Sequence, residues 1–270
     1  TPPSWSKRSS ASCEATERIG HKGHPVQSLR MSAARRVREL VSGSPLLTQT
    51  TQSGWTLAQR ALRGRKLKAY FSANPRVRLM IGSGPSQLDG WLATDLIPSR
   101  PDVVLLDAGE TFPFDDATVD RIHTEHMIEH VDHPIGAHML AECFRIMKPG
   151  GRIRLLTPDF DRVIALATDP PADVAELARQ SNLRNGIDPD EASDPTYAVN
   201  RLFSGYGHRF LYTESSLTRA MTKAGFTAIT RYPVGDTEDP DFADVDQHGN
   251  QINEDWNDYQ TLCLEATKPA

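Results

Sequence analysis

The stretch RLMIGSGPSQLDGWLATDL, residues 78–96, decides the fold class of this chain. It holds two short apolar runs, the first ending at Gly82-Ser83-Gly84 and the second at Asp95. Further runs of this kind follow at DVVLLD (102–107), VDRIHTE (119–125) and GGRIRLLTPD (150–159). Helical patterns separate the later runs, and such alternation indicates a parallel sheet with helices on its faces.

The ends of these runs carry residues that suit a nucleoside. Ligands of an open parallel sheet bind outside the carboxyl ends of its strands. The glycine pair lets the backbone turn sharply and approach a ligand closely. Asp95 can accept both hydroxyls of a ribose, and Asp107-Ala108 suits the edge of an adenine. A dinucleotide fingerprint is not complete, because Gln87 stands at the third glycine position. The sequence therefore predicts a nucleoside pocket.

Composition indicates a soluble globular protein. The 270 residues are 38% apolar and 24% charged, and no run approaches the ~18 apolar residues of a membrane span. Cys13, Cys143 and Cys263 stand alone without a C-x-x-C pair. We expect the last two to be buried thiols. Lone thiols suit a reducing compartment, so we expect a cytoplasmic protein.

Charge and composition divide the chain into three parts. Residues 1–30 are rich in Ser, Pro and His and are predicted to be disordered; residues 31–75 form a basic helical arm; residues 76–270 form the α/β domain. Residues 1–70 contain 13 Lys+Arg against 3 Asp+Glu, and the remainder carries a net charge of −15. The arm lacks interleaved aromatic residues and the domain is acidic, so a nucleic-acid partner is not favoured. We expect the arm to pack on its own domain or on a second copy in a homodimer.

Three segments resemble a known family: RLMIGSGPSQLDGWLATDL, PFDDATVDRIHTEHMIEHV (113–131) and LAECFRIMKPGGRIRLLTPDF (140–160). They look like successive motifs of class I S-adenosylmethionine-dependent methyltransferases, and the resemblance covers roughly residues 76–269. In detail they are similar to predicted methyltransferases associated with glycan biosynthesis. The resemblance implies a Rossmann-like fold with a mostly parallel seven-stranded sheet, an antiparallel last strand and helices on both faces, here preceded by the N-terminal arm.

The resemblance also implies S-adenosylmethionine as the cofactor. Its binding residues are then expected at four strand ends: Gly82, Ser83, Gly84, Asp95, Leu96, Asp107, Ala108, Glu125 and His126. The sequence departs from the family pattern at Met80, where an acid is usual. Only nine residues separate the first two runs, so we expect at most one helical turn between them.

The segment HTEHMIEHVDH, residues 123–133, contains four of the nine histidines. Its H-x-x-E-H spacing is that of some zinc peptidases, but Pro134 follows too soon for the long helix that those enzymes need. A second hypothesis is a divalent cation held by His126, Glu129 and His130, as in the E-x-x-E-H pattern of quinone O-methyltransferases; the first histidine weighs against Mg²⁺.

A third interpretation of this segment involves no metal. Glu125 and His126 then line the methionine part of the cofactor pocket, while Glu129 and His130 contact substrate or are structural. We prefer this interpretation. His123, inside the strand, is expected to be a packed core residue.

Three residues are candidates for the chemistry. An alcohol acceptor benefits from a general base of near-neutral pKa, and His208 in GYGHRFLY (205–212) is the first candidate, with a lid-packing role as the alternative. Asp159 and His130 come next. The region of about 160–212 is expected to form a lid over the acceptor. Arg201 and Arg209 either bind an anionic part of the substrate or pair with the acidic loop near residue 240.

Together these features predict a methyltransferase acting on a hydroxyl of a saccharide or related metabolite. The alternatives are a natural-product, lipid or quinone O-methyltransferase, or a non-catalytic methyltransferase-like subunit. The expected partner is a small-molecule or oligosaccharide acceptor. The N-P-P-Y type motif of amino-methylating DNA enzymes is missing, because the fifth run ends in TPDF.

Overall fold

The computed structural model describes the backbone of residues 45–270 and the side chains of residues 56–270. Residues 56–270 form one compact unit. The predicted tail and the helical pattern after Met31 lie outside the described residues. Helix α2 (Pro45–Ala73) lies within the predicted helical arm and ends just ahead of Asn74-Pro75. None of the described helices combines the length and apolar character required for a membrane span.

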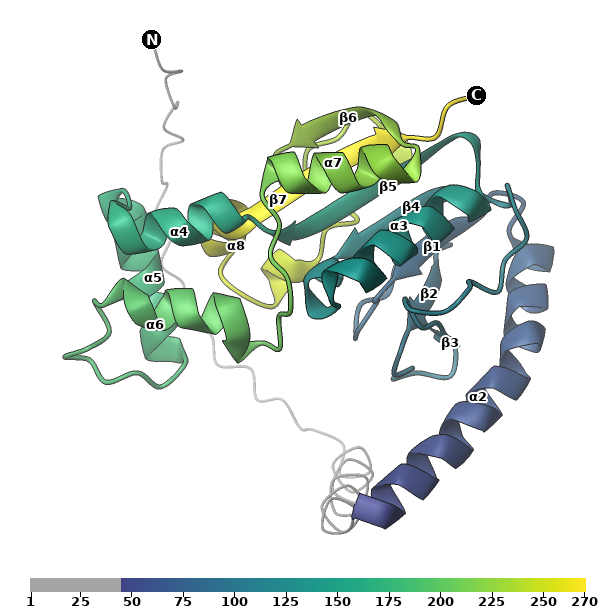
Figure 1. Ribbon diagram of the computed structural model, residues 1–270, viewed down its shortest axis with the longest axis horizontal. Coiled ribbons are helices and arrows are strands. Elements are labelled where there is room, and N and C mark those ends of the chain that lie inside the picture. Colours follow the sequence, from purple (N-terminus) through teal and green to yellow (C-terminus); the bar gives the residue numbers. More distant parts are fainter. Residues whose placement is uncertain (1–44) are drawn as a thin grey trace, which may run out of the picture. The chain divides into compact units, whose positions relative to one another are not determined.

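Seven strands form a single sheet (Figure 1): β1 (Arg78–Ile81), β2 (Leu92–Asp95), β3 (Val104–Leu105), β4 (Val119–Glu125), β5 (Met147–Pro158), β6 (Thr227–Tyr232) and β7 (Thr261–Thr267). Their order across the sheet is β3-β2-β1-β4-β5-β7-β6. Strand β7 is antiparallel to both of its neighbours, and the remaining pairs are parallel. The predicted seven-stranded, Rossmann-like sheet with an antiparallel last strand is confirmed.

Apart from α2, the helices of the described chain come after β4 in the sequence. They are η1 (Ile128–His130), α3 (His133–Ile146), α4 (Phe160–Thr168), α5 (Ala172–Arg184), α6 (Pro195–Asn200), the π-helix η2 (Arg201–Gly205), α7 (Glu214–Ala224), η3 (Pro240–Phe242), η4 (His248–Asn250) and α8 (Glu254–Gln260). In the described chain no helix lies between β1 and β4. The ten-residue connection between β1 and β2 is too short for a crossover helix, as predicted. Strands β1 to β3 therefore open directly into loops at their carboxyl ends.

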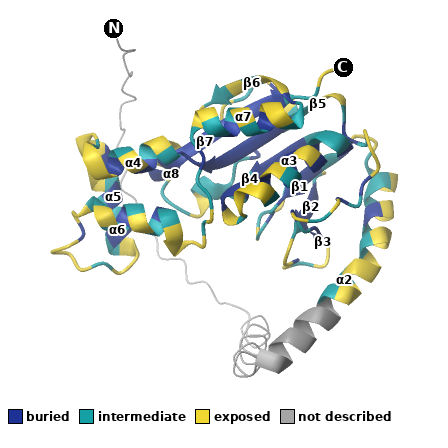
Figure 2. Ribbon diagram, viewed as in Figure 1, coloured by how far each residue is buried: buried dark blue, intermediate teal, exposed yellow. Residues whose placement is uncertain are grey.

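One face of the sheet is apolar. Leu79, Ile122, Ile153 and Leu262 point to this side and form one core with residues of α3 and α7. These strand residues are fully buried, as the dark strands of Figure 2 show. Cys143 of α3 lies in the same core, which confirms that it is a buried thiol.

The other face is polar and equally buried. His123, Arg154 and Glu265 have no exposed surface there, so the predicted packing of His123 is confirmed. The acidic loop of residues 233–253, which contains η3 and η4, covers this face: Asp246 pairs with Arg154 and its Oδ1 lies 3.3 Å from His123 Nε2. A buried charge requires such partners.

The acidic loop does not pair with the arginines that were candidates for it. Its carboxylates bind arginines of the sheet, whereas Arg209 pairs with Asp132 at 2.8 Å. Arg201 donates to Ser181 and Asn182. The expected pairing of Arg201 and Arg209 with the loop is therefore wrong, because basic side chains on β4 and β5 lie beneath the loop.

A second small core lies at the carboxyl end of β5. It joins α4, α5, α6 and η2 to Trp256 of α8 through Val163, Leu166, Ala198 and Leu202. Figure 1 shows α4, α5 and α6 grouped to one side of the sheet, and their outward surfaces are exposed in Figure 2. This group corresponds to the region predicted as a lid.

Candidate functional site

The loops after β1 and β2 are bound to one another at the carboxyl edge of the sheet. Gly84 N donates to Asp95 Oδ2 at 2.9 Å and Ile97 N to Asp95 Oδ1 at 2.8 Å. Ser83 N donates to Thr94 O at 2.9 Å. After β3, Asp107 Oδ1 accepts from Gly109 N at 2.9 Å. Because β3, β2, β1 and β4 are neighbours, the strand ends named from the sequence meet at one edge.

This edge has the features of a cradle for a polar ligand. Ser83 Oγ is buried and has no hydrogen-bond partner among the described residues. Gly84 has φ +52°, and a Cβ added there would meet no atom within 4 Å, so its surroundings are open. Leu96 and Ile97 are 56% and 68% exposed and offer apolar surface beside Asp95. Since buried polar atoms generally have partners, Ser83 Oγ points to a missing ligand, and these residues fit a nucleoside cofactor.

Gly82 shows why glycine is required in this loop. Its φ is +70°, and a Cβ there would lie 2.4 Å from Met127 Cγ. Any other residue would have both an unfavourable backbone and a clash with the segment after β4. The close approach of the two loops thus depends on this glycine.

Glu125, at the end of β4, anchors the acidic loop. Its Oε2 accepts from Gln247 N at 2.9 Å and its Oε1 from His248 N at 3.0 Å. The carboxylate therefore fixes the backbone of the loop, a role that the sequence did not predict. In this way the end of β4 determines where His248 lies.

His126 follows with φ +49°, which is uncommon for a residue other than glycine. Its Nδ1 lies 3.1 Å from Glu129 Oε1 and its Nε2 lies 3.3 Å from Thr261 Oγ1. Its ring packs against His248, with ring centroids 4.0 Å apart. Strained backbone of this kind is found at functional sites, and here it directs an imidazole between η1, η4 and β7.

Glu129 is fully buried beneath these rings. Thr157 Oγ1 donates to its Oε2 at 3.0 Å, and its own backbone carbonyl accepts from Arg209 N at 2.7 Å. Burial opposes the charged form, but the hydrogen bond from His126 and the charges of nearby histidines outweigh it and lower the pKa of Glu129. The site therefore contains an ionised carboxylate that is shielded from water.

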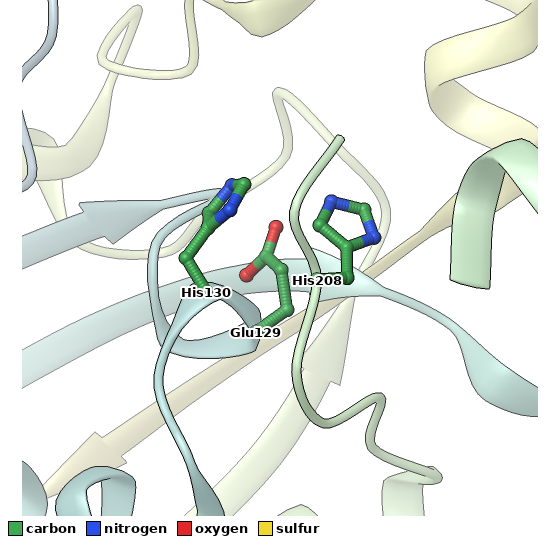
Figure 3. A group of neighbouring side chains, drawn as sticks. All are labelled: Glu129, His130 and His208. Atoms are coloured by element: carbon green, nitrogen blue, oxygen red, sulfur yellow. The ribbon is translucent and has the colours of Figure 1, made fainter. Parts of the chain in front are cut away.

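His208 lies beside this carboxylate, on the segment before α7. Its Nδ1 donates to the carbonyl of Leu202, and because a carbonyl only accepts, the neutral ring keeps its lone pair on Nε2. Burial is the main cause that lowers the pKa of His208, so the ring is neutral at pH 7. Figure 3 shows His130 and His208 on either side of the Glu129 carboxylate.

These three side chains also form a set of potential metal ligands. Donor atoms of Glu129, His130 and His208 all lie within 4.8 Å of one another. His126, predicted as a ligand, is instead the hydrogen-bond partner of Glu129, and His208 takes its place in the group. Two imidazoles and one carboxylate do not fit the oxygen preference of Mg²⁺ but suit Zn²⁺ and related ions.

Asp159 has a structural position. It is 2% exposed, its Oδ1 caps α4 by accepting from Asp161 N, and its Oδ2 pairs with Arg231 at 2.7 Å. Both oxygens are thus engaged at the start of α4, and we leave Asp159 out of the chemistry for which it was a candidate. Tyr212, which the sequence did not single out, lies close by; burial and the charge of Glu129 raise its pKa to about 12.

A cavity of about 610 Å³ lies next to these residues. It is lined by His126, Pro158, Ser181, Arg184, Asn185, Leu202, Tyr206, His208, His248, Gln251, Ile252, Asn253, Trp256 and Gln260. His126 and His208 were predicted site residues. Most of the others lie in or directly beside α5, η4 and α8, whose approach to the site no local motif indicates.

One polar atom of this cavity has no partner. Gln260 is 4% exposed, and its Oε1 makes no hydrogen bond within the described chain. An amide oxygen accepts hydrogen bonds only. A ligand with a hydroxyl or N–H donor would satisfy it.

Comparison with known proteins agrees with the fold. Residues 65–231 match the family model of a methyltransferase domain. A stretch of 51 residues is 39% identical to an uncharacterised 37.1 kDa protein in a transposon of Streptomyces fradiae, and it spans 19% of this chain and 14% of that protein.

Similar solved structures include a SAM-dependent methyltransferase from Archaeoglobus fulgidus, with 17% identity, a TM-score of 0.42 and coverage of 79% of this chain and 94% of that one. A methyltransferase from Bacillus halodurans, so far assigned without experiment, has 16% identity, a TM-score of 0.38 and coverage of 76% and 99%. The family match spans more than half of the residues. The chain therefore belongs to the methyltransferase-domain family, the class I S-adenosylmethionine-dependent enzymes.

Proposed function

We propose that this protein transfers a methyl group from S-adenosylmethionine to a hydroxyl of a polyhydroxylated acceptor, with saccharides as the first class to test. The polar lining of the cavity carries this proposal: Gln260 is one of its residues, and the Oε1 of that side chain has no hydrogen-bond partner in the described chain. Asn185, Gln251 and Asn253 add further amides to the lining. A lipid with few polar atoms would leave such groups unpaired, at a cost of about 1–3 kcal/mol for each buried one.

The cofactor is assigned to the carboxyl edge of β1 to β4. Gly82, Ser83 and Gly84 would hold it through the loop after β1. The remaining contacts would come from residues already named at the other strand ends: Asp95, Leu96, Asp107, Ala108 and His126. Glu125, predicted as a further contact, instead holds the acidic loop with both oxygens. When bound, it supplies an electrophilic methyl group on a positively charged sulfur. The protein then mainly aligns the acceptor and excludes water.

His208 is the proposed general base. Its Nδ1 is held by the carbonyl of Leu202, which leaves Nε2 to take the proton of the acceptor hydroxyl. The ionised Glu129 alongside stabilises the imidazolium that forms. His130, whose ring centroid is 4.8 Å from that of His208, completes the wall around the base. Asp159 has no part in this step.

The same three side chains support a second route of activation, in which a Zn²⁺-like ion acidifies the acceptor hydroxyl. We favour the base, because both oxygens of Glu129 already have hydrogen-bond partners in His126 and Thr157. The expected result is full activity in EDTA. Loss of activity in EDTA that Zn²⁺ restores, but Mg²⁺ does not, would replace the base with the metal.

The test begins with calorimetric titration of S-adenosylhomocysteine, with Asp95→Ala expected to abolish binding. Methyl transfer is then measured on hexoses, hexuronates, sugar phosphates, quinones and lipids. His208→Gln should keep cofactor binding and lower kcat by about 10²–10⁴-fold. The control is His138→Gln, which alters a histidine of α3 that hydrogen-bonds to the carbonyl of Glu110 and should leave kcat unchanged. Cofactor binding without turnover on any acceptor would contradict the enzymatic proposal and favour a non-catalytic subunit.

A further inference from the structure

The residues that line the cavity carry no acidic side chain although the protein as a whole is acidic. The chain has a net charge of −5, yet none of the residues that line the cavity is Asp or Glu. Arg184, in the last turn of α5, is the one permanent charge in that lining. The wall is therefore suited to a neutral or negatively charged molecule and not to a cation.

A second guanidinium lies directly behind this wall. Arg201 Nη2 donates to Ser181 Oγ at 2.9 Å and to Asn182 Oδ1 at 3.1 Å. Ser181 itself lines the cavity and lies one helical turn before Arg184 on α5. Arg201 is also the chain neighbour of Leu202, another lining residue. The two cations thus flank the same part of the wall.

Neither guanidinium is neutralised by a carboxylate in the described part of the chain. Arg184 makes no side-chain hydrogen bond or ion pair there, and the partners of Arg201 are uncharged. Nearby arginines behave differently: Arg179, also on α5, pairs with Glu176 at 2.7 Å, and Arg209 pairs with Asp132. The two arginines beside the cavity therefore retain charge for a ligand.

We propose that Arg184 and Arg201 form an anion subsite of the acceptor cavity, and that the acceptor is an acidic saccharide, a polyol bearing a carboxylate or a phosphate. This inference rests on the proposed function and specifies its substrate class. Guanidinium groups bind planar carboxylates and phosphates in a bidentate manner. The amides and aromatic rings of the same wall would contact the sugar, and the histidine side faces the hydroxyl that is methylated.

The test compares direct binding of glucose, glucuronate and glucose 6-phosphate by calorimetry at low salt. We expect one of the two acidic sugars to bind at least about tenfold more tightly than glucose, and which one does so identifies the anion. Inorganic phosphate alone serves as the probe for a phosphate-specific subsite. Equal affinity for the neutral and both acidic sugars would overturn the proposal.

Variants identify the residues responsible. Arg184→Gln should weaken the affinity for the preferred anion about tenfold. Because Arg184 is exposed, the fold should be retained. Arg201→Gln should add to this loss, while Arg179→Gln on the same helix is the matched control and should change nothing. An equal loss in Arg179→Gln would mean only a general charge effect and would overturn the subsite. If the protein methylates neutral sugars and shows no preference for acidic ones, this inference is refuted and the proposed function stands. If anions bind at these arginines but no acceptor is methylated, the proposed function is refuted and the anion subsite stands.

Discussion

The two faces of the sheet are buried equally but by opposite means. Leu155 and Arg154 are consecutive residues of β5, and neither has exposed surface. Leu155 enters the apolar core beneath α3 and α7. Arg154 instead pairs with Glu265 at 2.7 Å and with Asp246 of the acidic loop. Two neighbouring side chains are thus buried by apolar packing on one face and by charge pairing on the other.

The apolar face mainly contributes stability, whereas the polar face mainly positions the acidic loop. Apolar burial is non-directional and scales with the area removed from water, so the helices of the apolar face mainly stabilise the sheet. Buried ion pairs contribute little net stability compared with apolar residues of similar size, but breaking one is costly. The polar face therefore requires the acidic loop to bind in one register. That register places His248 in the cavity.

The largest expected effect is that of Arg154→Ala. It leaves the buried Asp246 carboxylate without its arginine and the buried Glu265 with Arg152 alone, so the free energy of unfolding should fall by about 3–5 kcal/mol. Urea denaturation measures this change. The control is Arg179→Ala, which breaks an exposed ion pair and should cost at most about 1 kcal/mol. Similar losses in both variants would mean that the polar face is not held by this charge.

The second largest expected effect is that of Leu155→Ala. It should lower the free energy of unfolding by about 2–5 kcal/mol, because it removes buried methyl groups and leaves a cavity. Unlike a variant of the polar face, it should leave the affinity for S-adenosylhomocysteine unchanged at temperatures where the fold persists. Calorimetric titration checks this. A large fall in affinity would show that the apolar face also positions the site.

Glu125→Ala removes the acceptor for two backbone N–H groups of the acidic loop. We expect a loss of about 1–3 kcal/mol, with affinity for S-adenosylhomocysteine within about threefold of wild type, since the structure shows Glu125 binding the loop. Glu125→Gln keeps one acceptor oxygen and should lose less stability. If cofactor affinity falls far more than stability does, the cofactor contact expected from the family resemblance is the more important role.

The smallest expected effect is on pH dependence. Burial, followed by the charge of His126, lowers the pKa of His248 to about 4, from an ordinary value of 6.5. The unfolded chain then binds the proton more tightly, so the contribution of His248 to stability is present above pH 6.5 and is lost as the pH falls toward 4. Urea denaturation gives the free energy of unfolding at pH 7.5 and at pH 5. The loss between these two pH values should be smaller for His248→Gln than for wild type. If wild type and His248→Gln lose the same free energy of unfolding between the two pH values, another group causes the acid sensitivity.

The sheet and its nucleotide-type edge were predictable from local patterns. Gly82, Gly84, Asp95 and Asp107 each end an apolar run, and parallel pairing alone brings such ends together. His208 was a candidate because a histidine that follows two glycines and precedes a helix suits a base near an acceptor. The position of Asp159 was predicted as well, but not its pairing with Arg231, which joins residues 72 positions apart along the chain.

The cavity was not predictable in the same way. Gln260, Trp256 and His248 lie far from His126 in sequence, and no spacing rule connects them. Their side chains meet only because the acidic loop lies on the polar face and α8 leads into β7 beside β5. The loop was recognised from sequence as acidic, but its partners Arg121, Arg152 and Arg154 could be identified only once the strands were in place.

The sequence by itself determined the class of fold and which candidate site residue ends each strand, because both depend on short-range periodicity and on residues adjacent to each strand. It also indicated the family, through the three segments that resemble it. The tertiary structure alone decided which carboxylates are structural and which side chains line the cavity. It also decided that Glu129, His130 and His208 meet. The physical reason is that buried charge is stabilised by partners at specific distances in space, and local sequence does not encode which distant residues supply them.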